Sequence, residues 1–254
     1  MSLSITNAFV EQYRNNVTML SQQRGSKLRD FVTVNNGVVG KTVFTEQIGA
    51  TEAKKRISRH SDSPLVDTPH KRRLYTMADY EWGDLIDKAD RVRMLIDPTS
   101  TYAQSAAFAM GRVMDDVIID ALKGDASIED AGAQTTVSLS QTVAKTFNDV
   151  NSGTDDVLNI AKLRQAHQLF HTANVPEDEE KFIVVSPKGI QQLLGAKEVT
   201  SSDFNTVKAL VNGEIDTFMG FRFIVSNRLA LSGNNRTCFA FARSGLELGI
   251  GQDV

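Results

Sequence analysis

The stretch from residue 98 to residue 123, PTSTYAQSAAFAMGRVMDDVIIDALK, decides the fold because it carries the clearest helix pattern in the chain. Asp97 can cap this helix, Pro98 suits its first turn, and Gly124 stands where a helix ends. Apolar residues recur every three or four positions and mark one face: Ala103, Ala106, Met110, Val113, Val117 and Ala121, widened by Ala107, Met114, Ile118 and Leu122. We therefore predict a central helix about 39 Å long, whose small side chains let other elements approach closely.

The segment before this helix predicts a long β-hairpin without a core of its own. Residues 30–48 are rich in Val, Phe and Thr around the turn signal Asn35-Asn36-Gly37, and residues 71–77 are typical of a returning strand. Residues 49–70 between them show almost no apolar periodicity, which is rare in a compact domain unless the segment has a function. Because a two-stranded ribbon is marginal alone in water, we expect it to rest on another copy of the chain.

The remaining elements alternate between helices and strands. Residues 125–154 are rich in Asp, Ala, Gly, Ser and Thr, which favours a linker with a short strand at 137–140. Further patterns predict helices at 5–20, 79–94, 155–173, 187–195 and 207–211, and strands at 181–186, 221–226 and 237–242. This order of elements predicts an α+β fold.

Composition limits the class of protein. Hydrophobic residues make up 41% of the chain and charged residues 23%, so a core can form, unlike in a disordered protein. A net charge of −3 argues against a dedicated nucleic-acid binder. The single cysteine cannot form an internal disulfide. The N-terminus does not resemble a secretory signal and no long apolar run occurs, so we expect a soluble cytoplasmic protein without a membrane span.

Enzyme motifs are missing from the sequence. It has no glycine-rich phosphate loop and no nucleophile elbow. Cys238 lies in an apolar strand pattern and is predicted to be a buried, inert thiol. His167 and His171 have the spacing of two metal ligands on one helix but lack a third, so we expect solvated histidines. We predict no catalytic residue, no metal and no cofactor.

Acidic residues gather in three places. Helix dipoles and solvation explain these clusters better than acid–base chemistry does. The clusters are Asp115 with Asp116, Asp155 with Asp156, and residues 177–180.

One basic run stands out near the predicted hairpin. Its members are Lys54, Lys55, Arg56, Arg59, Arg72 and Arg73. DNA binding is weakened as an explanation because no aromatic residues are interleaved for stacking. A solvated loop and a clamp on an acidic neighbouring subunit remain, and we favour the clamp. Reversing Arg72 and Arg73 to glutamate is then expected to leave a folded subunit that does not assemble.

Four stretches together resemble the major capsid proteins of tailed bacteriophages with the Hong Kong 97-like fold. They are GATEAKKRISRH (49–60), VDTPHKRRLYTMADYEWGDLID (66–87), RMLIDPTSTYAQSAAFAMGRVMDDVIIDAL (93–122) and VTSSDFNTVKALVNGEIDTFMGFRFIVSNRL (199–229). They cover nearly the whole chain in order. The resemblance implies an α+β Hong Kong 97-like fold, and no residue matches the covalent cross-link known in one branch.

The resemblance also implies a division of the chain. Its parts are an N-terminal arm at 1–36, an extended β-hairpin loop at 37–78, a peripheral domain at 79–154 with a spine helix at 98–123, an axial domain at 155–235, and return strands toward the peripheral domain at 236–254. The family leads us to expect further strands after these, so the closure of the peripheral sheet stays open.

The function implied is a structural one. The chain would be a major capsid protein whose hexamers and pentamers form an icosahedral head around packaged double-stranded DNA, without sequence-specific binding. Its partners would be copies of itself and scaffolding, portal or decoration proteins, with assembly in the host cytoplasm. The alternative is a DNA-associated packaging, scaffold or head-decoration protein, and a hydrolase with an unseen site is a third hypothesis.

Overall fold

The computed structural model describes residues 21–59, 62–63, 65–85, 99–130, 132–148, 157–195, 217–233 and 235–251. The chain divides into two compact units. The first contains residues 1–26 and 80–113, and the second contains residues 27–79 and 114–254. The helices predicted at 5–20 and 207–211 lie outside the described residues, as do Asp155 and Asp156.

The long helix predicted at 98–123 is present as α2, Thr99–Lys123. In the first unit, residues 25 and 26 lie directly against it, because a Cβ at Gly111 would come within 2.5 Å of the carbonyl carbon of Gly25. Arg112 holds the same segment by donating from Nη1 to Gln22 Oε1 at 2.9 Å. The small residue at position 111 therefore allows the close approach that the helix pattern predicted. No helix in the described part of the chain is long and apolar enough to cross a membrane.

The helix predicted at 79–94 is wrong over residues 79–85, which have no regular structure. Two residues that were predicted to anchor this helix in a core are instead exposed, Leu85 by 95% and Trp82 by 44%. A helix of this length depends on packing of its apolar face. Residues 86–94 lie outside the described range.

A four-stranded sheet forms the centre of the second unit. Its strand order is β11-β6-β8-β7. The strands are β6 (Lys181–Val185), β7 (Thr217–Phe218), β8 (Phe221–Val225) and β11 (Phe239–Ala242). β6 runs parallel to β8 and antiparallel to β11, and all of its residues are buried. A strand buried on both faces shows the continuous apolar run seen in KFIVV.

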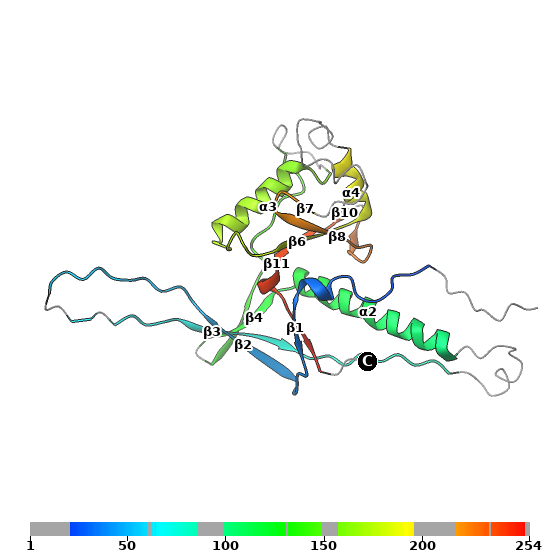
Figure 1. Ribbon diagram of the computed structural model, residues 1–254, viewed down its shortest axis with the longest axis horizontal. Coiled ribbons are helices and arrows are strands. Elements are labelled where there is room, and N and C mark those ends of the chain that lie inside the picture. Colours follow the sequence, from blue (N-terminus) through cyan, green and yellow to red (C-terminus); the bar gives the residue numbers. More distant parts are fainter. Residues whose placement is uncertain are drawn as a thin grey trace, which may run out of the picture. The chain divides into compact units, whose positions relative to one another are not determined.

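One face of this sheet is covered by two helices, α3 (Ile160–Thr172) and α4 (Pro187–Leu194), as Figure 1 shows. Leu163 and Leu193 pack there on Ile183, Val185 and Phe221. The helices begin with side-chain caps: Asn159 accepts from the amide of Lys162 at 2.9 Å, and Ser186 accepts from that of Gly189 at 3.2 Å. The strand and helix predictions for this region are confirmed, with shorter ends.

The other face of the sheet packs on the C-terminal half of α2. Ile118 and Ile119 share one apolar cluster with Phe182 and Val184 of β6 and with Leu28. Because side chains alternate along a strand, β6 sends Ile183 and Val185 to one cluster and Phe182 and Val184 to the other. The central sheet is thus the middle layer of the unit.

A second sheet, of strand order β2-β3-β4-β5, contains the predicted hairpin. Its strands are β2 (Thr42–Ile48), β3 (His70–Thr76), β4 (Ala126–Asp130) and β5 (Ala133–Val137). β2 pairs with β3 from Thr42 opposite Thr76 to Ile48 opposite His70. The prediction of a linker at 125–154 is wrong for 126–137. Small polar residues can form a strand when a neighbouring strand has a free edge, and here β4 pairs with the edge of β3. Gly132, with φ at 82°, makes the turn between β4 and β5.

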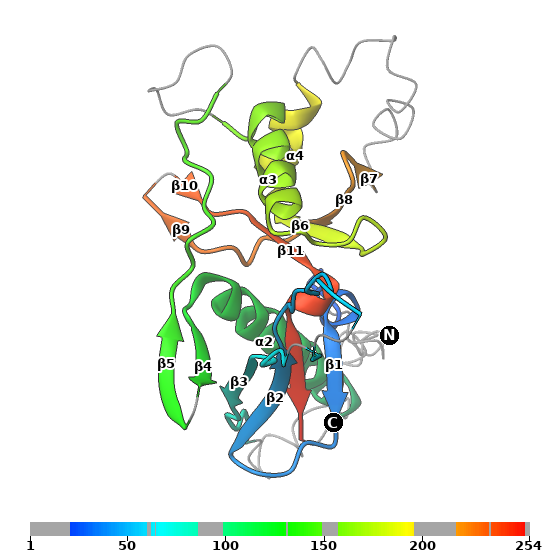
Figure 2. The same ribbon diagram turned by 90° about the vertical axis from the view of Figure 1, so that its left-hand side faces the viewer.

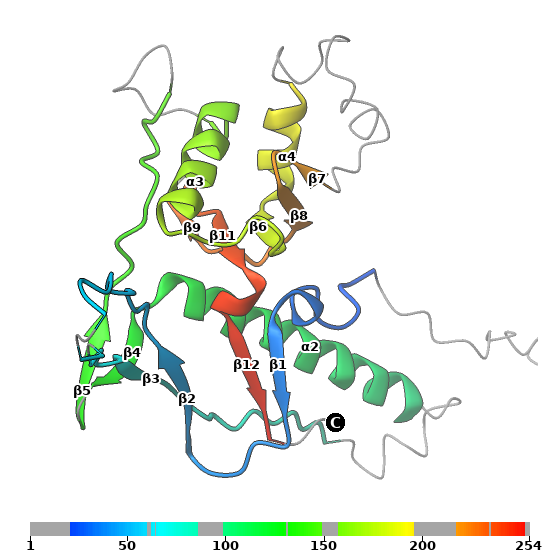
Figure 3. The same ribbon diagram turned by 60° about the vertical axis from the view of Figure 1, so that its left-hand side comes forward.

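A third, two-stranded sheet joins distant parts of the chain. β1 (Thr33–Asn36) runs parallel to β12 (Glu247–Ile250). Figure 3 shows β11 leading through the short 3-10 helix η4 (Arg243–Gly245) into β12. A second 3-10 helix, η2 (Arg29–Phe31), precedes β1, and β9 (Leu231–Ser232) pairs with β10 (Asn235–Arg236). The chain after residue 236 therefore continues through β11 into a strand that pairs with β1, and its assignment as a return to the peripheral domain stays a prediction.

Glu247 fastens this pair of strands to the hairpin. Its carboxylate accepts from Thr45 Oγ1 at 2.7 Å, from the Tyr75 hydroxyl at 3.1 Å and from Asn35 Nδ2 at 3.2 Å. Tyr75 also lies over Gly249, where a Cβ would come within 2.6 Å of its ring. Burial first, and then the bond to Glu247, raise the pKa of Tyr75. One carboxylate thereby joins strands β1, β2, β3 and β12.

We predict that Tyr75 makes stability fall at high pH. The unfolded chain has the ordinary tyrosine pKa of 10.0, so above that pH it loses the proton before the folded state does. The contribution of Tyr75 is complete below pH 10 and is lost as the pH rises through its raised folded pKa. Urea unfolding between about pH 8 and pH 11 should show a steeper loss for the natural protein than for Tyr75→Phe.

Tyr80→Phe is the matched control for this experiment, because Tyr80 is 53% exposed. Its pH profile should follow that of the natural protein. Parallel profiles for Tyr75→Phe and the natural protein would contradict the prediction.

Candidate interaction surface

Residues 49–69 form a loop that extends beyond the paired ends of β2 and β3. The last bond between its two arms runs from the amide of Gly49 to the carbonyl of Pro69 at 2.9 Å. Every described residue from 49 to 67 is exposed, and Figure 1 shows the segment as a long open ribbon. Ile57 and Leu65 are each 96% exposed. Single exposed apolar side chains are common on protein surfaces, but two that are almost fully exposed on one segment whose described residues are nearly all exposed favour a contact with another chain.

The sequence prediction missed these two apolar residues. It concentrated on charge, and single apolar residues in a polar stretch form no periodic pattern. The sequence did hold a signal for this exposure, because Ile57 and Leu65 lie in a segment without a strand or helix pattern that could bury them. Ile57 and Leu65 together are called the apolar tip.

Four of the predicted contact residues lie on the same loop. Lys54, Lys55, Arg56 and Arg59 are all exposed. The Arg56 guanidinium donates to the carbonyl oxygen of Arg59. Acidic side chains are interleaved in the same segment at Glu52, Asp62 and Asp67. The loop is therefore mixed in charge, with a local basic run next to Ile57.

The other two predicted contact residues lie within the sheet and have partners in their own chain. Arg72 forms an ion pair with Glu46 at 3.1 Å, its direct neighbour across β2 and β3, and Glu129 is its neighbour on β4. Arg73 donates from Nε to Gln47 Oε1 at 3.4 Å. The structure thus separates the six basic residues into a loop group and a sheet group. A contact of either group with another subunit stays a prediction.

This arrangement weakens the charge reversal of Arg72 and Arg73 as a test of assembly. A glutamate at position 72 would lie between Glu46 and Glu129, and like charges directly opposite each other destabilise a sheet. A failure to assemble would then have a local cause. The loop group gives the cleaner experiment.

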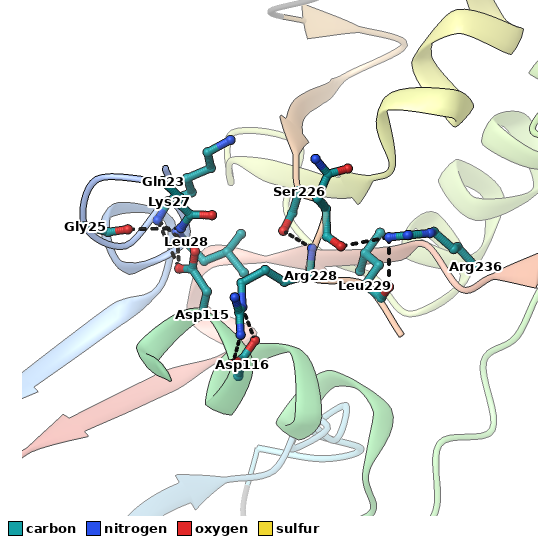
Figure 4. A network of polar contacts seen from close by, with 11 residues as sticks. Gln23, Gly25, Lys27, Leu28, Asp115, Asp116, Ser226, Arg228, Leu229 and Arg236 are labelled. Carbon is teal, nitrogen blue, oxygen red and sulfur yellow. Dashed lines mark hydrogen bonds and ion pairs between the residues drawn. The ribbon is translucent and has the colours of Figure 1, made fainter. Parts of the chain in front are cut away.

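The acidic pair on α2 does not match the prediction of solvated carboxylates. Asp115 is fully buried, with 0% exposure, and accepts from the amide of Lys27 at 3.0 and 3.1 Å and from that of Leu28 at 3.0 Å (Figure 4). The prediction is wrong for Asp115 because it treated the pair as one. Spacing could have shown the difference, since Asp115 lies three residues before Ile118 and shares its buried face.

Asp116 turns toward the surface and pairs with Arg228, which follows β8. The two side chains are 37% and 34% exposed. The hydrogen bond from Asp116 raises the pKa of Arg228 above its ordinary value. Ser226 helps to position Arg228, because its hydroxyl accepts a hydrogen bond from the backbone amide of Arg228 at 3.2 Å. The two neighbouring carboxylates therefore bind the helix to two different segments of the unit.

The sequence profile of a family described as "Phage capsid protein" matches residues 5–254. The chain belongs to this family. A structure of the capsid of cyanophage P-SCSP1u is 17% identical with a TM-score of 0.65, and the match covers 94% of this chain and 79% of that one. A structure from Mycobacterium phage Che8 is 18% identical with a TM-score of 0.63, covering 97% and 85%. A comparison with curated protein sequences found no match.

These findings confirm the resemblance to tailed-phage major capsid proteins and the Hong Kong 97-like fold. The capsid protein is thus a structural component of the phage head, and its place is the virion shell, where copies of it associate. A structure from Mycobacterium phage Adephagia, 13% identical with a TM-score of 0.62, covers 100% of this chain and 79% of that one. The likeness extends along the whole capsid protein.

The histidines and the cysteine that were considered as metal ligands or as a nucleophile pack against other side chains in this capsid protein. His167 lies 4.3 Å from the ring of His171 and packs edge-on against Phe221 at 6.0 Å. Burial, followed by His171 and Lys181, lowers the pKa of His167. The prediction of solvated histidines therefore holds only for His171, which is exposed. Cys238 is partly buried beside the central sheet, and burial raises its pKa, which keeps the thiol protonated and unreactive.

We predict that Asp115→Ala destabilises the capsid protein strongly. The substitution leaves the amides of Lys27 and Leu28 without this acceptor in a buried place, and a hydrogen bond to a charged group contributes about 1.5–3 kcal/mol. We expect the free energy of unfolding to fall by about 3 kcal/mol or more. Denaturant titration of the full chain measures it.

Asp116→Ala is the matched control on the adjacent position. Its pair with Arg228 is partly exposed, and such pairs are worth about 0–1 kcal/mol. Equal losses for the two variants would show that the bonds of Asp115 do not carry the stability assigned to them.

Proposed function

We propose that this capsid protein assembles into hexamers and pentamers that close an icosahedral head around double-stranded DNA, and that the extended loop makes the main contact between neighbouring copies. The observation that carries this proposal is the loop of residues 49–69: every described side chain from 49 to 67 is exposed, and no described residue of its own chain buries the apolar tip. A second copy supplies the missing surface.

Burial of the apolar tip supplies the attraction. Moving one large aliphatic side chain from water into an interface contributes roughly 1.5–3 kcal/mol, before the cost of ordering the loop is subtracted. Each contact is therefore weak. A closed symmetric shell repeats it in every subunit, so weak contacts suffice. The adjacent basic run sets the register of docking and the rate of encounter more than its strength.

The division into an arm (1–36), a loop (37–78), a peripheral domain (79–154), an axial domain (155–235) and return strands (236–254) is part of this proposal. Support comes from α2 in the peripheral part and from the sheet between α3, α4 and α2 in the axial part. The pairing of β12 with β1 supports a return of the chain.

The proposal includes no enzymatic activity, cofactor or metal. Scaffolding, portal or decoration proteins are the expected partners, assembly takes place in the host cytoplasm, and the DNA is enclosed without sequence-specific contacts. A DNA-associated packaging, scaffold or head-decoration role is less favoured. The basic run of this chain is preceded by Glu52 and interrupted by Asp62 and Asp67, which offset the charge that phosphate binding needs.

We predict that Ile57→Asp combined with Leu65→Asp gives a folded subunit that does not form shells. Both side chains are 96% exposed in the single chain, so the folded state loses no packing. In the shell, the same change would bury two unpaired charges. Negative-stain electron microscopy should show at least a tenfold drop in shell number, while circular dichroism and thermal melting stay unchanged.

The matched control keeps the apolar character at both sites, as Ile57→Val with Leu65→Ile. This variant should form shells like the natural protein. Normal shells from the aspartate variant would rule out the apolar tip as a contact.

We predict that reversing Lys54, Lys55 and Arg56 to glutamate slows assembly most at low salt. Charges in solution act over about 10 Å at 0.1 M salt and about 3 Å at 1 M. Light scattering should show a large difference in assembly rate from the natural protein at low salt and a small one at high salt. A variant with three glutamines should lie between them. A rate that ignores both charge and salt would remove these residues from the interface.

A further inference from the structure

The strand β5 and the residues after it form an edge without charges. Residues 131–144 contain no Lys, Arg, Asp, Glu or Pro. The described residues from 132 to 142 are all exposed. In a chain in which charged residues make up 23%, an exposed run of this length without any charge is unusual.

The alternation typical of a strand continues past the end of β5. Thr135, Val137 and Leu139 alternate with polar residues, and Val137 and Leu139 are 43% and 52% exposed. The partner strand β4 ends earlier, because its first residue, Ala126, lies opposite Val137. Residues 138–142 therefore have a strand pattern but no strand partner within the described part of the chain.

β5 is also the outermost strand of its sheet, as Figure 2 shows. Among the described residues it pairs only with β4, so its outer backbone groups face away from the sheet. Natural proteins protect such edges with lysine, proline or a covering segment. The opposite edge strand, β2, carries Glu46, and Thr45 on it bonds to Glu247. Within the described ranges, β5 has neither a charged residue nor a covering strand on its outer side.

We propose that β5 pairs antiparallel with β5 of a second copy across a two-fold axis. The absence of charge argues for this occupant. In an antiparallel two-fold pair centred on Val137, Thr135 of one copy meets Leu139 of its mate and Val137 meets itself, so charges of one sign on this side of the strand would face like charges. An uncharged strand is self-complementary. The basic loop of another copy would bring Lys54, Lys55 and Arg56 to an edge that offers no opposite charge.

This contact extends the proposed function, on which it rests, by naming a second surface between copies. The loop joins neighbours head to tail, whereas a β5 pair is isologous and joins two copies symmetrically. A closed shell requires contacts of both kinds, since rings alone do not close a container. Each pair of side chains across two strands contributes little by itself, which suits a weak contact that is repeated in every copy.

The test uses charge at two positions on one side of the strand. One variant carries Thr135→Lys and Leu139→Lys, and the other carries Thr135→Glu and Leu139→Glu. Each alone should reduce shell number at least tenfold, with folding checked by circular dichroism and melting. An equal mixture should restore shells, because Lys of one copy then meets Glu of its mate. Rescue by mixing is specific for pairing of the strand with itself.

A second measurement does not depend on shells. The variant Val137→Cys should form a disulfide-linked dimer under mild oxidation, while Lys188→Cys, exposed on α4, should not. Cys238 adds little background because burial raises its pKa. Normal shells from either charged variant, or folded variants that mixing fails to rescue, would overturn the β5 pair. If the natural protein forms no shells but Val137→Cys dimerises, the proposed function fails and the β5 pair stands. Absence of that dimer overturns the pair.

Discussion

The buried carboxylate of Asp115 is the constraint on which the second unit depends. A charge at 0% exposure is tolerated only when hydrogen bonds replace its water, and here the amides of Lys27 and Leu28 supply them. These bonds fix the path of the chain before β1. Leu28 is thereby placed in the apolar cluster that α2 shares with the central sheet. The strand β1 follows and receives β12, so one side chain of the helix determines where both ends of the unit meet.

Everything else in the unit is arranged around the central sheet and is joined to the hairpin through a second, half-buried acid. β6 separates two apolar clusters, and β11 continues into β12, which carries Glu247. Glu247 then binds Thr45 and Tyr75 at the base of the hairpin. A rigid base matters because every described residue from 49 to 67 in the loop beyond it is exposed. Two carboxylates therefore link the core to the loop, one by ordering β1 and the other by binding β2 and β3.

Sequence patterns predicted those elements whose side chains pack within a single layer. The helix α2 and the strands β3, β6 and β8 follow from local residue patterns, and their ends shift by a residue or two. Patterns failed where a distant partner decides the outcome. Residues 126–137 form strands because β3 offers an edge, and residues 79–85 form no helix because no core receives Trp82 and Leu85. Asp115 was missed for the same reason, since its donors lie 87 and 88 positions away.

The same reasoning explains why the interaction surface was found only in part. Charge can be recognised in a sequence, so the basic run was identified, but sequence does not show that Arg72 is engaged by Glu46 whereas Lys54 is exposed. The importance of Ile57 and Leu65 becomes apparent only from the fold, in which no residue of the described ranges covers them. A folded chain buries what it can within itself. What it leaves exposed and apolar, on a loop held by a rigid base and along an edge without charges, is the surface that we propose other copies of this capsid protein complete.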